Sequence, residues 1–216
     1  MKTTKDVENY LEINLGDCKS TLKECSKNDQ GVSIVYNNKK AFNFDKISKK
    51  IFPSGLTSID SICFRNKHID FVEFKSGFLD KIDMNYNPST YPCIDEEYFK
   101  LLTKVRKKEK KELTQNIQLK IVESLYVLKD IILPKCDDTS TEYDINFTLV
   151  FESGKINPLD EFEIGVENLA NIKETRNKLF RSLRKYQGQD SNGNKIFFEK
   201  IDIISNLEFN NLAIYN

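Results

Sequence analysis

The chain has 216 residues, of which 39% are hydrophobic and 31% charged, and its 33 basic and 33 acidic side chains give a formal net charge of zero. This composition excludes an intrinsically disordered chain, and the length is sufficient for a single domain, 1–216, whose core needs no disulfides. A neutral chain has no net attraction for nucleic acid, so any such binding must depend on local basic patches.

The first residues carry charges of both signs, and no stretch approaches the roughly 18 apolar residues of a membrane span. We therefore expect a cytoplasmic protein that does not contact membranes. The cysteines are odd in number and have neither the Cys-x-x-Cys nor the Cys/His spacing of a zinc site, so we expect reduced thiols. They are Cys18, Cys25, Cys63, Cys93 and Cys136.

Short elements are expected in the N-terminal quarter. Residues 4–13 and 17–27 have helical patterns. The β-branched and aromatic residues of 31–38 predict a strand, which a polar cluster ends, and residues 41–47 predict its paired strand.

A β-hairpin follows the turn residues at 53–55. The runs 58–64 and 68–75 are rich in β-branched and aromatic residues and are separated by three polar residues, which predicts two strands and their turn. The next stretch, 78–95, is polar, contains two prolines and has few helix signals. We expect a loop or a polar insertion there.

The second half alternates helices and strands. Apolar residues at helical spacing predict a long helix over 95–133, ended by Pro134. A strand is expected over 143–153, a helix over 160–186 and a final strand over 195–204. This order predicts the α/β (α+β) class, with a mixed central β-sheet flanked by helices.

The hairpin places two acidic side chains opposite each other. If the chain turns at Asn66 and Lys67, antiparallel pairing aligns a set of opposed residues on one face. The pairs are Phe64 with Ile69, Ile62 with Phe71, and Asp60 with Glu73. Because the first two pairs are apolar, this face is expected to be buried, so the carboxylates continue a buried stripe.

Lys75 lies two residues after Glu73 and therefore shares its face. Opposed carboxylates repel each other unless a cation neutralises them, and oxygen ligands suit Mg²⁺ or Mn²⁺. Such a metal activates water and neutralises a phosphoryl oxygen, while a nearby lysine stabilises developing charge. The pattern predicts phosphodiester hydrolysis, with Asp60, Glu73 and the Phe74 backbone carbonyl as metal ligands and Lys75 as the catalytic lysine.

This arrangement resembles the motif of the PD-(D/E)XK, or restriction-endonuclease-like, nuclease superfamily. Asp60 is followed after twelve residues by Glu73-Phe74-Lys75, and Ile59 stands where the motif has proline. The likeness covers residues 59–77 and implies a restriction-endonuclease-like core with Asp60, Glu73 and Lys75 as catalytic residues.

The resemblance implies a Mg²⁺- or Mn²⁺-dependent endonuclease that hydrolyses DNA, in phage defence, a mobile element or repair. It leaves open which acid on an early helix, among Glu8, Glu12 and Glu24, completes the site. On the long helix, Gln118 and Lys120 resemble polar residues that some members direct toward the site.

Three other interpretations remain open. Lys75 can form a structural ion pair with both acids, the chain can be an inactive nuclease-fold binding or interaction module, or it can be an RNA endonuclease. DNA is favoured over RNA as the partner, and a homodimer or larger assembly is left open. The single histidine, His68, falls at the hairpin tip and is expected to be structural.

Two basic runs can each be a solvated helix face or a grip on a phosphate backbone. The first consists of Lys104, Arg106, Lys107, Lys108, Lys110 and Lys111. The second consists of Lys173, Arg176, Lys178, Arg181, Arg184 and Lys185.

Overall fold

The structure is a computed structural model, and six strands of one sheet lie within the residues that it describes. Those residues are 4–65, 67–76, 95–136, 143–152, 166–188, 191 and 197–212. The strands are β1 (Lys19–Thr21), β2 (Lys40–Asn43), β3 (Ser61–Arg65), β4 (His68–Lys75), β5 (Asp144–Phe151) and β6 (Lys200–Ser205). They lie side by side in sequence order. Neighbours from β1 to β4 are antiparallel, whereas β4, β5 and β6 run parallel.

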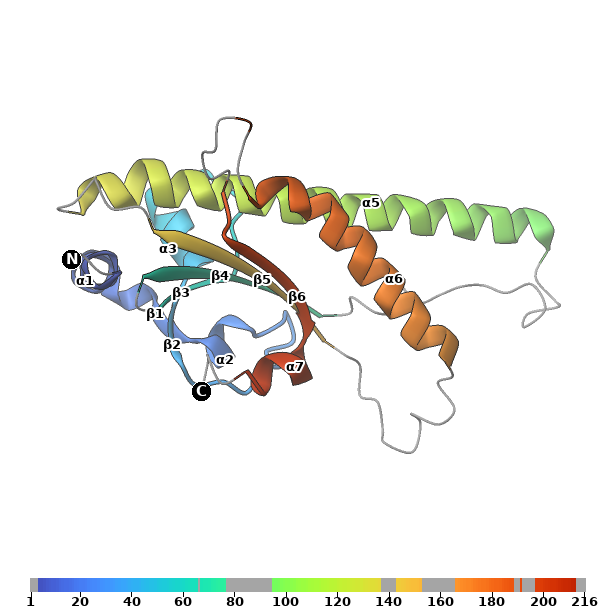
Figure 1. Cartoon of the computed structure of the whole chain (residues 1–216), viewed down its shortest axis with the longest axis horizontal. Helices are drawn as coiled ribbons and strands as arrows, with labels where there is room; N and C mark the ends of the chain where they lie inside the picture. Colours follow the sequence, from blue (N-terminus) through green and yellow to red (C-terminus); the bar gives the residue numbers. More distant parts are fainter. Residues whose placement is uncertain are drawn as a thin grey trace.

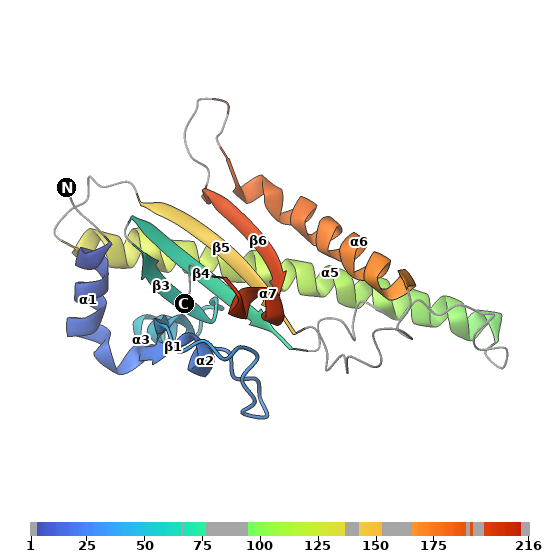
Figure 2. The ribbon, with the colours of Figure 1, turned by 60° about the horizontal axis from the view of Figure 1, so that its bottom comes forward.

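Helices cover both faces of the sheet, as predicted for a mixed α/β protein (Figures 1 and 2). They are α1 (Lys5–Leu15), α2 (Leu22–Cys25), α3 (Phe44–Ile51), α5 (Glu96–Tyr126), α6 (Val166–Leu183) and α7 (Asn206–Asn210). The long helices α5 and α6 lie on one face and connect parallel strands, which a tight turn cannot do. The short helices α2 and α7 lie on the other face.

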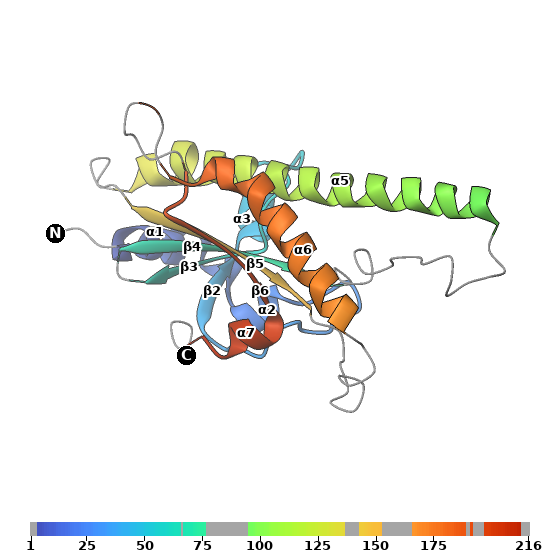
Figure 3. The same cartoon turned by 45° about the vertical axis from the view of Figure 1, so that its right-hand side comes forward.

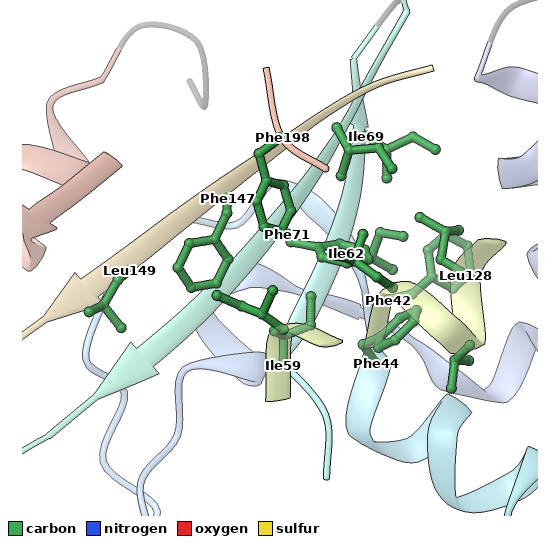
Figure 4. Packing of buried hydrophobic residues seen from close by; sticks show 14 of the residues in the cluster. Phe42, Phe44, Ile59, Ile62, Ile69, Phe71, Leu128, Phe147, Leu149 and Phe198 are labelled. Carbon is green, nitrogen blue, oxygen red and sulfur yellow. The ribbon is translucent and has the colours of Figure 1, made fainter. Parts of the chain in front are cut away.

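Alternation along the strands sorts apolar side chains into two clusters, one on each face. On the α5 side, Ile62 and Phe71 belong to a cluster that includes Ile121. Figure 4 shows this packing around Phe71, whose ring centroid lies 5.4 Å from that of Phe44. On the other side, Val72 packs in a cluster with Phe209 of α7.

The predicted hairpin register is confirmed. The observed partners are Ser61 with Val72, Ile62 with Phe71, Cys63 with Asp70, Phe64 with Ile69, and Arg65 with His68. Asp60 directly precedes β3, so the same register places it opposite Glu73. The two acids therefore lie on the α5 side of the sheet.

The strand prediction for 31–38 is wrong, because this segment wraps around α2 instead of entering the sheet. The amide of Ile34 donates to the Ser26 carbonyl at 3.2 Å. Ile34 and Val35 are buried in the cluster beneath α2, so the apolar pattern reflects packing rather than strand pairing.

The strand predicted over 41–47 is present only up to Asn43, where β2 ends, and it pairs with β1 and β3 and not with 31–38. The Asn43 side chain accepts a hydrogen bond from the amide of Lys46 at 2.8 Å and so caps α3. This N-cap turns the chain into a helix where the composition favoured a strand.

The long helix is confirmed. α5 has 31 residues, continues into a π-helical turn, Val127–Ile132, and ends near Pro134. Its N-terminal part extends past the edge of the sheet (Figures 1 and 3). None of the helices in the described ranges is long and apolar enough to cross a membrane.

The predicted helix over 17–27 is wrong for Lys19–Thr21, which form β1, and only Leu22–Cys25 within it are α-helical. The other boundaries differ from prediction by a few residues. β5 matches its predicted range closely, whereas β6 begins at Lys200, later than predicted. The predicted insertion at 78–95 and the start of the predicted helix at 160–165 lie outside the described residues, except for Asp95.

We expect Phe71→Ala to lower the free energy of unfolding by about 3–5 kcal/mol, because it leaves a cavity among buried aromatic rings. Urea unfolding followed by circular dichroism measures this change. Leu207→Ala is the control, since Leu207 is 61% exposed, and it should change stability by less than about 0.5 kcal/mol. Equal losses in both variants would contradict the assignment of the core.

Candidate active site

Asp60 and Glu73 meet where β3 and β4 separate. Glu73 is fully buried, at 0% exposure, whereas the side chain of Asp60 is 24% exposed. The backbone amide of Phe74 donates to Asp60 Oδ2 at 2.6 Å. Because the N–H and C=O of one strand residue point to the same side, the Phe74 carbonyl also faces the side on which Asp60 lies.

Two lysines neutralise this acid pair. Lys75 Nζ lies 2.6 Å from Glu73 Oε1. Lys120 Nζ, from α5, lies 2.8 Å and 3.1 Å from the two Glu73 carboxylate oxygens and 3.3 Å from Asp60 Oδ1. The Lys120 ammonium therefore bridges the two carboxylates.

Hydrogen bonds hold the segment before Asp60 against α5. The Ile59 amide donates to Ser124 Oγ at 2.9 Å. The Thr57 amide donates to Glu123 Oε2 at 2.6 Å. Lys120 lies one helical turn before Ser124, so the same contact surface that fixes this segment directs Lys120 toward the acids.

Burial raises the pKa of Asp60 to about 7, and repulsion from Glu73 adds to this rise. Attraction to Lys120 and the hydrogen bond from the Phe74 amide act in the opposite direction but are weaker. Burial alone would lower the pKa of Lys120, yet the attraction of Glu73 and Asp60 outweighs it and raises that pKa. The site thus favours the charged form of Lys120 and disfavours the ionised form of Asp60.

A second buried carboxylate, Asp70, lies on the opposite face of the sheet and provides a comparison. Arg65 forms a two-pronged ion pair with it, with Nη2 at 2.6 Å from Oδ1. Asn146 Nδ2 donates to the same oxygen at 2.9 Å. One guanidinium satisfies this single carboxylate, which indicates a structural role.

None of the three early acids left open by the sequence contacts Asp60 or Glu73. Glu8 and Glu12 pair with Lys40. Glu24 pairs with Lys27 at 2.7 Å.

Of the two polar residues on the long helix, only Lys120 reaches the acids. Gln118 donates instead to the Ser182 backbone carbonyl at 3.2 Å, which joins α5 to α6. Lys120 carries a signal in the sequence, because it lies at helical spacing among Ile117, Ile121 and Ser124, which mark the inward side of the helix.

Other singled-out residues lie away from the acid pair. His68 begins β4, at the opposite end of the strand from Lys75, and is partly buried. In the first basic run, Lys104, Lys107 and Lys111 are exposed on α5. In the second run, Arg176 pairs with Glu208 of α7 at 3.2 Å.

The residues present are compatible with a hard divalent cation. Among the described residues, no group of three or more His, Cys, Asp or Glu side chains is arranged to hold a metal. Mg²⁺, however, is often bound through one or two carboxylates, with water and substrate oxygens completing its shell. Asp60 and Glu73 supply these carboxylates on the side faced by the Phe74 carbonyl, and the Lys120 ammonium now bridging them would have to move.

No protein-family model, curated protein or solved structure gives a significant match to this chain. The site therefore has to be judged from its own geometry and charge.

The raised pKa of Asp60 predicts a specific pH dependence of stability. The folded protein binds this proton more tightly than the unfolded chain, whose pKa is near the ordinary 3.8, so stability falls as pH rises from about 4 to about 7. Asp60→Asn resembles the protonated form and removes this loss. In EDTA, we expect its melting temperature to exceed that of the native protein at pH 8, by a margin that shrinks at pH 5.

Asp70→Asn is the matched control, because it changes a buried aspartate that has its own arginine. We expect it to be destabilising at both pH values, since it breaks a buried ion pair. A lower melting temperature for Asp60→Asn at pH 8 would contradict the predicted effect of burial on Asp60.

Proposed function

We propose that this protein is a metal-dependent endonuclease of the PD-(D/E)XK type, which hydrolyses phosphodiester bonds in DNA. The observation that carries the proposal is the convergence of Asp60 and fully buried Glu73 on one lysine, at the end of the central strand pair β3 and β4. Buried like charges are costly, and a fold rarely places them together without a partner ion or a chemical use.

Each group has a distinct task in this proposal. Asp60 and Glu73 would hold a Mg²⁺ or Mn²⁺ ion together with the Phe74 carbonyl, and the ion would activate water and offset phosphate charge. Lys75, already 2.6 Å from Glu73, would orient the attacking water or stabilise negative charge on the phosphate. The fixed segment before Asp60 would keep the acids in position as substrate enters.

The order of elements supports the same proposal. An antiparallel hairpin carries the acids, a helix crosses over, and β5 pairs parallel to β4. This succession agrees with the core that the sequence resemblance implies. The exposed lysines of α5 offer further positive charge for a nucleic acid backbone.

One observation favours a second candidate, an inactive nuclease-fold binding or interaction module. Lys75 and Lys120 together balance the charges of Asp60 and Glu73, so an ion-paired scaffold is chemically complete without a metal. The two candidates differ in metal binding and in cleavage.

We expect the native protein to cut plasmid or single-stranded DNA in Mg²⁺ or Mn²⁺. Asp60→Ala, Glu73→Gln and Lys75→Ala should each reduce the rate by at least about 100-fold, because each removes a group that would act on the phosphate. Gel assays with DNA and RNA in parallel measure the rate and identify the substrate.

Asp70→Asn and Lys46→Ala are controls that change the same residue types away from the site, and both should keep native rates if folded. Circular dichroism must show that every variant is folded. If no nucleic acid is cut with either metal and calorimetry detects no metal binding, the nuclease proposal is wrong and the binding module is favoured. If the protein cuts RNA and not DNA, the substrate is RNA and the assignment of DNA is wrong.

Lys120 should compete with the metal, because its ammonium bridges the same two carboxylates. We therefore expect Lys120→Met to bind Mn²⁺ several-fold more tightly in calorimetry, whereas Lys46→Met should not change the affinity. Weaker binding by Lys120→Met would indicate that the lysine organises the carboxylates and does not compete with the ion.

A further inference from the structure

The outward side of α5 carries a regular repeat that the proposed function does not use. Positions spaced alternately by three and four residues form one continuous stripe, and all of them are exposed. We call them the outer stripe: Tyr98, Leu101, Val105, Lys108, Glu112, Gln115, Leu119, Val122 and Tyr126. This is the a and d spacing of a coiled coil, sustained over about four heptads.

Both ends of the outer stripe are apolar, and its middle is polar. The six apolar side chains are 45–55% exposed. A helix on the surface of a domain normally turns a polar side outward, whereas α5 is apolar on its inward side and along much of the outer stripe. Two apolar sides on one helix indicate a second packing partner.

The position of α5 strengthens this inference. Its N-terminal part runs past the edge of the sheet (Figures 1 and 3). Tyr98, Leu101 and Val105 belong to this part of the helix and are exposed. Short helical segments that pack against nothing are marginally stable in water, and they depend on the packing of an apolar side for their stability. A partner helix on the outer stripe would supply that packing.

We propose that the outer stripe binds a second copy of this chain, with the two α5 helices antiparallel. The charges in the middle of the stripe determine the orientation. When the two helices cross midway between Lys108 and Glu112, Lys108 of each copy faces Glu112 of the other. A parallel pair would instead oppose Lys108 to Lys108 and Glu112 to Glu112, and like charges across a seam are destabilising.

The same alignment matches the apolar residues. Leu101 faces Leu119 of the other copy, Tyr98 faces Val122, and Val105 meets a polar residue, Gln115. Tyr126 has no opposed position on the other α5 and instead packs against Phe52 of its own chain, with ring centroids 5.9 Å apart. A heptad stripe winds slowly around a straight helix, so the two helices would cross at about 20° in a left-handed supercoil. The alignment thus satisfies both the apolar and the charged positions of one sequence.

The dimer would also set the spacing of the candidate sites, a consequence that rests on the proposed function. Lys120 lies about ten residues from the crossing point, so the two copies of Lys120 would be separated by about 30 Å along the helices. A two-fold axis that exchanges antiparallel helices is perpendicular to the plane containing them. Both candidate sites would therefore lie on the same side of the plane that contains the two helix axes.

Sedimentation equilibrium of the full chain tests the dimer without reference to activity. We expect a mass of twice 25.2 kDa at high concentration. Leu101→Lys combined with Leu119→Lys should give a monomer with native circular dichroism, because both positions are exposed in the single chain. A native protein that stays monomeric, or a dimer unaffected by this double change, would overturn the proposal.

A charge exchange tests the orientation. Lys108→Glu and Glu112→Lys should each weaken the native dimer by about ten-fold or more, because each opposes like charges. Mixing these two variants should produce a heterodimer, and combining both changes in one chain should restore the dimer. Failure of both rescues would exclude the antiparallel alignment, whatever the outcome of the cleavage assays.

Discussion

Two carboxylates meet where β3 and β4 separate, and their repulsion is a constraint that the surrounding structure has to satisfy. The hairpin register fixes their positions, because a shift of one strand by one residue would place the acid of that strand on the other face of the sheet. Lys75 neutralises Glu73 from within β4, and α5 supplies a second positive charge through Lys120, while the contacts of Ser124 and Glu123 keep that helix in place. The acids, the register and the helix therefore depend on one another.

The comparison of Asp60 with Asp70 shows how burial alone fails to identify a candidate site. Asp70 is completely buried, yet Arg65 and Asn146 both form hydrogen bonds to its carboxylate. Asp60 shares Lys120 with Glu73 and retains partial contact with solvent. The difference lies in the sharing of one lysine by two carboxylates and in access to solvent, which are the properties that a substrate or a metal ion would use.

Much of the fold could be predicted from the sequence because its signals are local. The hairpin register follows from a short turn and two apolar pairs, and the limits of α5 follow from apolar spacing and Pro134. The segment 31–38 could not be predicted, since its apolar residues pack on α2 in a pattern that resembles a strand. The sequence marks Lys120 as a polar residue on the inward side of a helix, but its place in the site depends on how that helix docks on a sheet distant in sequence.

The contribution of α5 to the acid pair has a consequence for how the chain folds. Lys120 lies 47 residues after Glu73, so during synthesis the hairpin, with Lys75, is complete before the lysine that bridges its two acids exists. A lone hairpin is marginally stable, and opposed carboxylates weaken it further. Closing the parallel pair of β4 and β5 requires the helix between them to dock first or at the same time. We therefore expect this end of the sheet to acquire its structure in one cooperative step, late in folding.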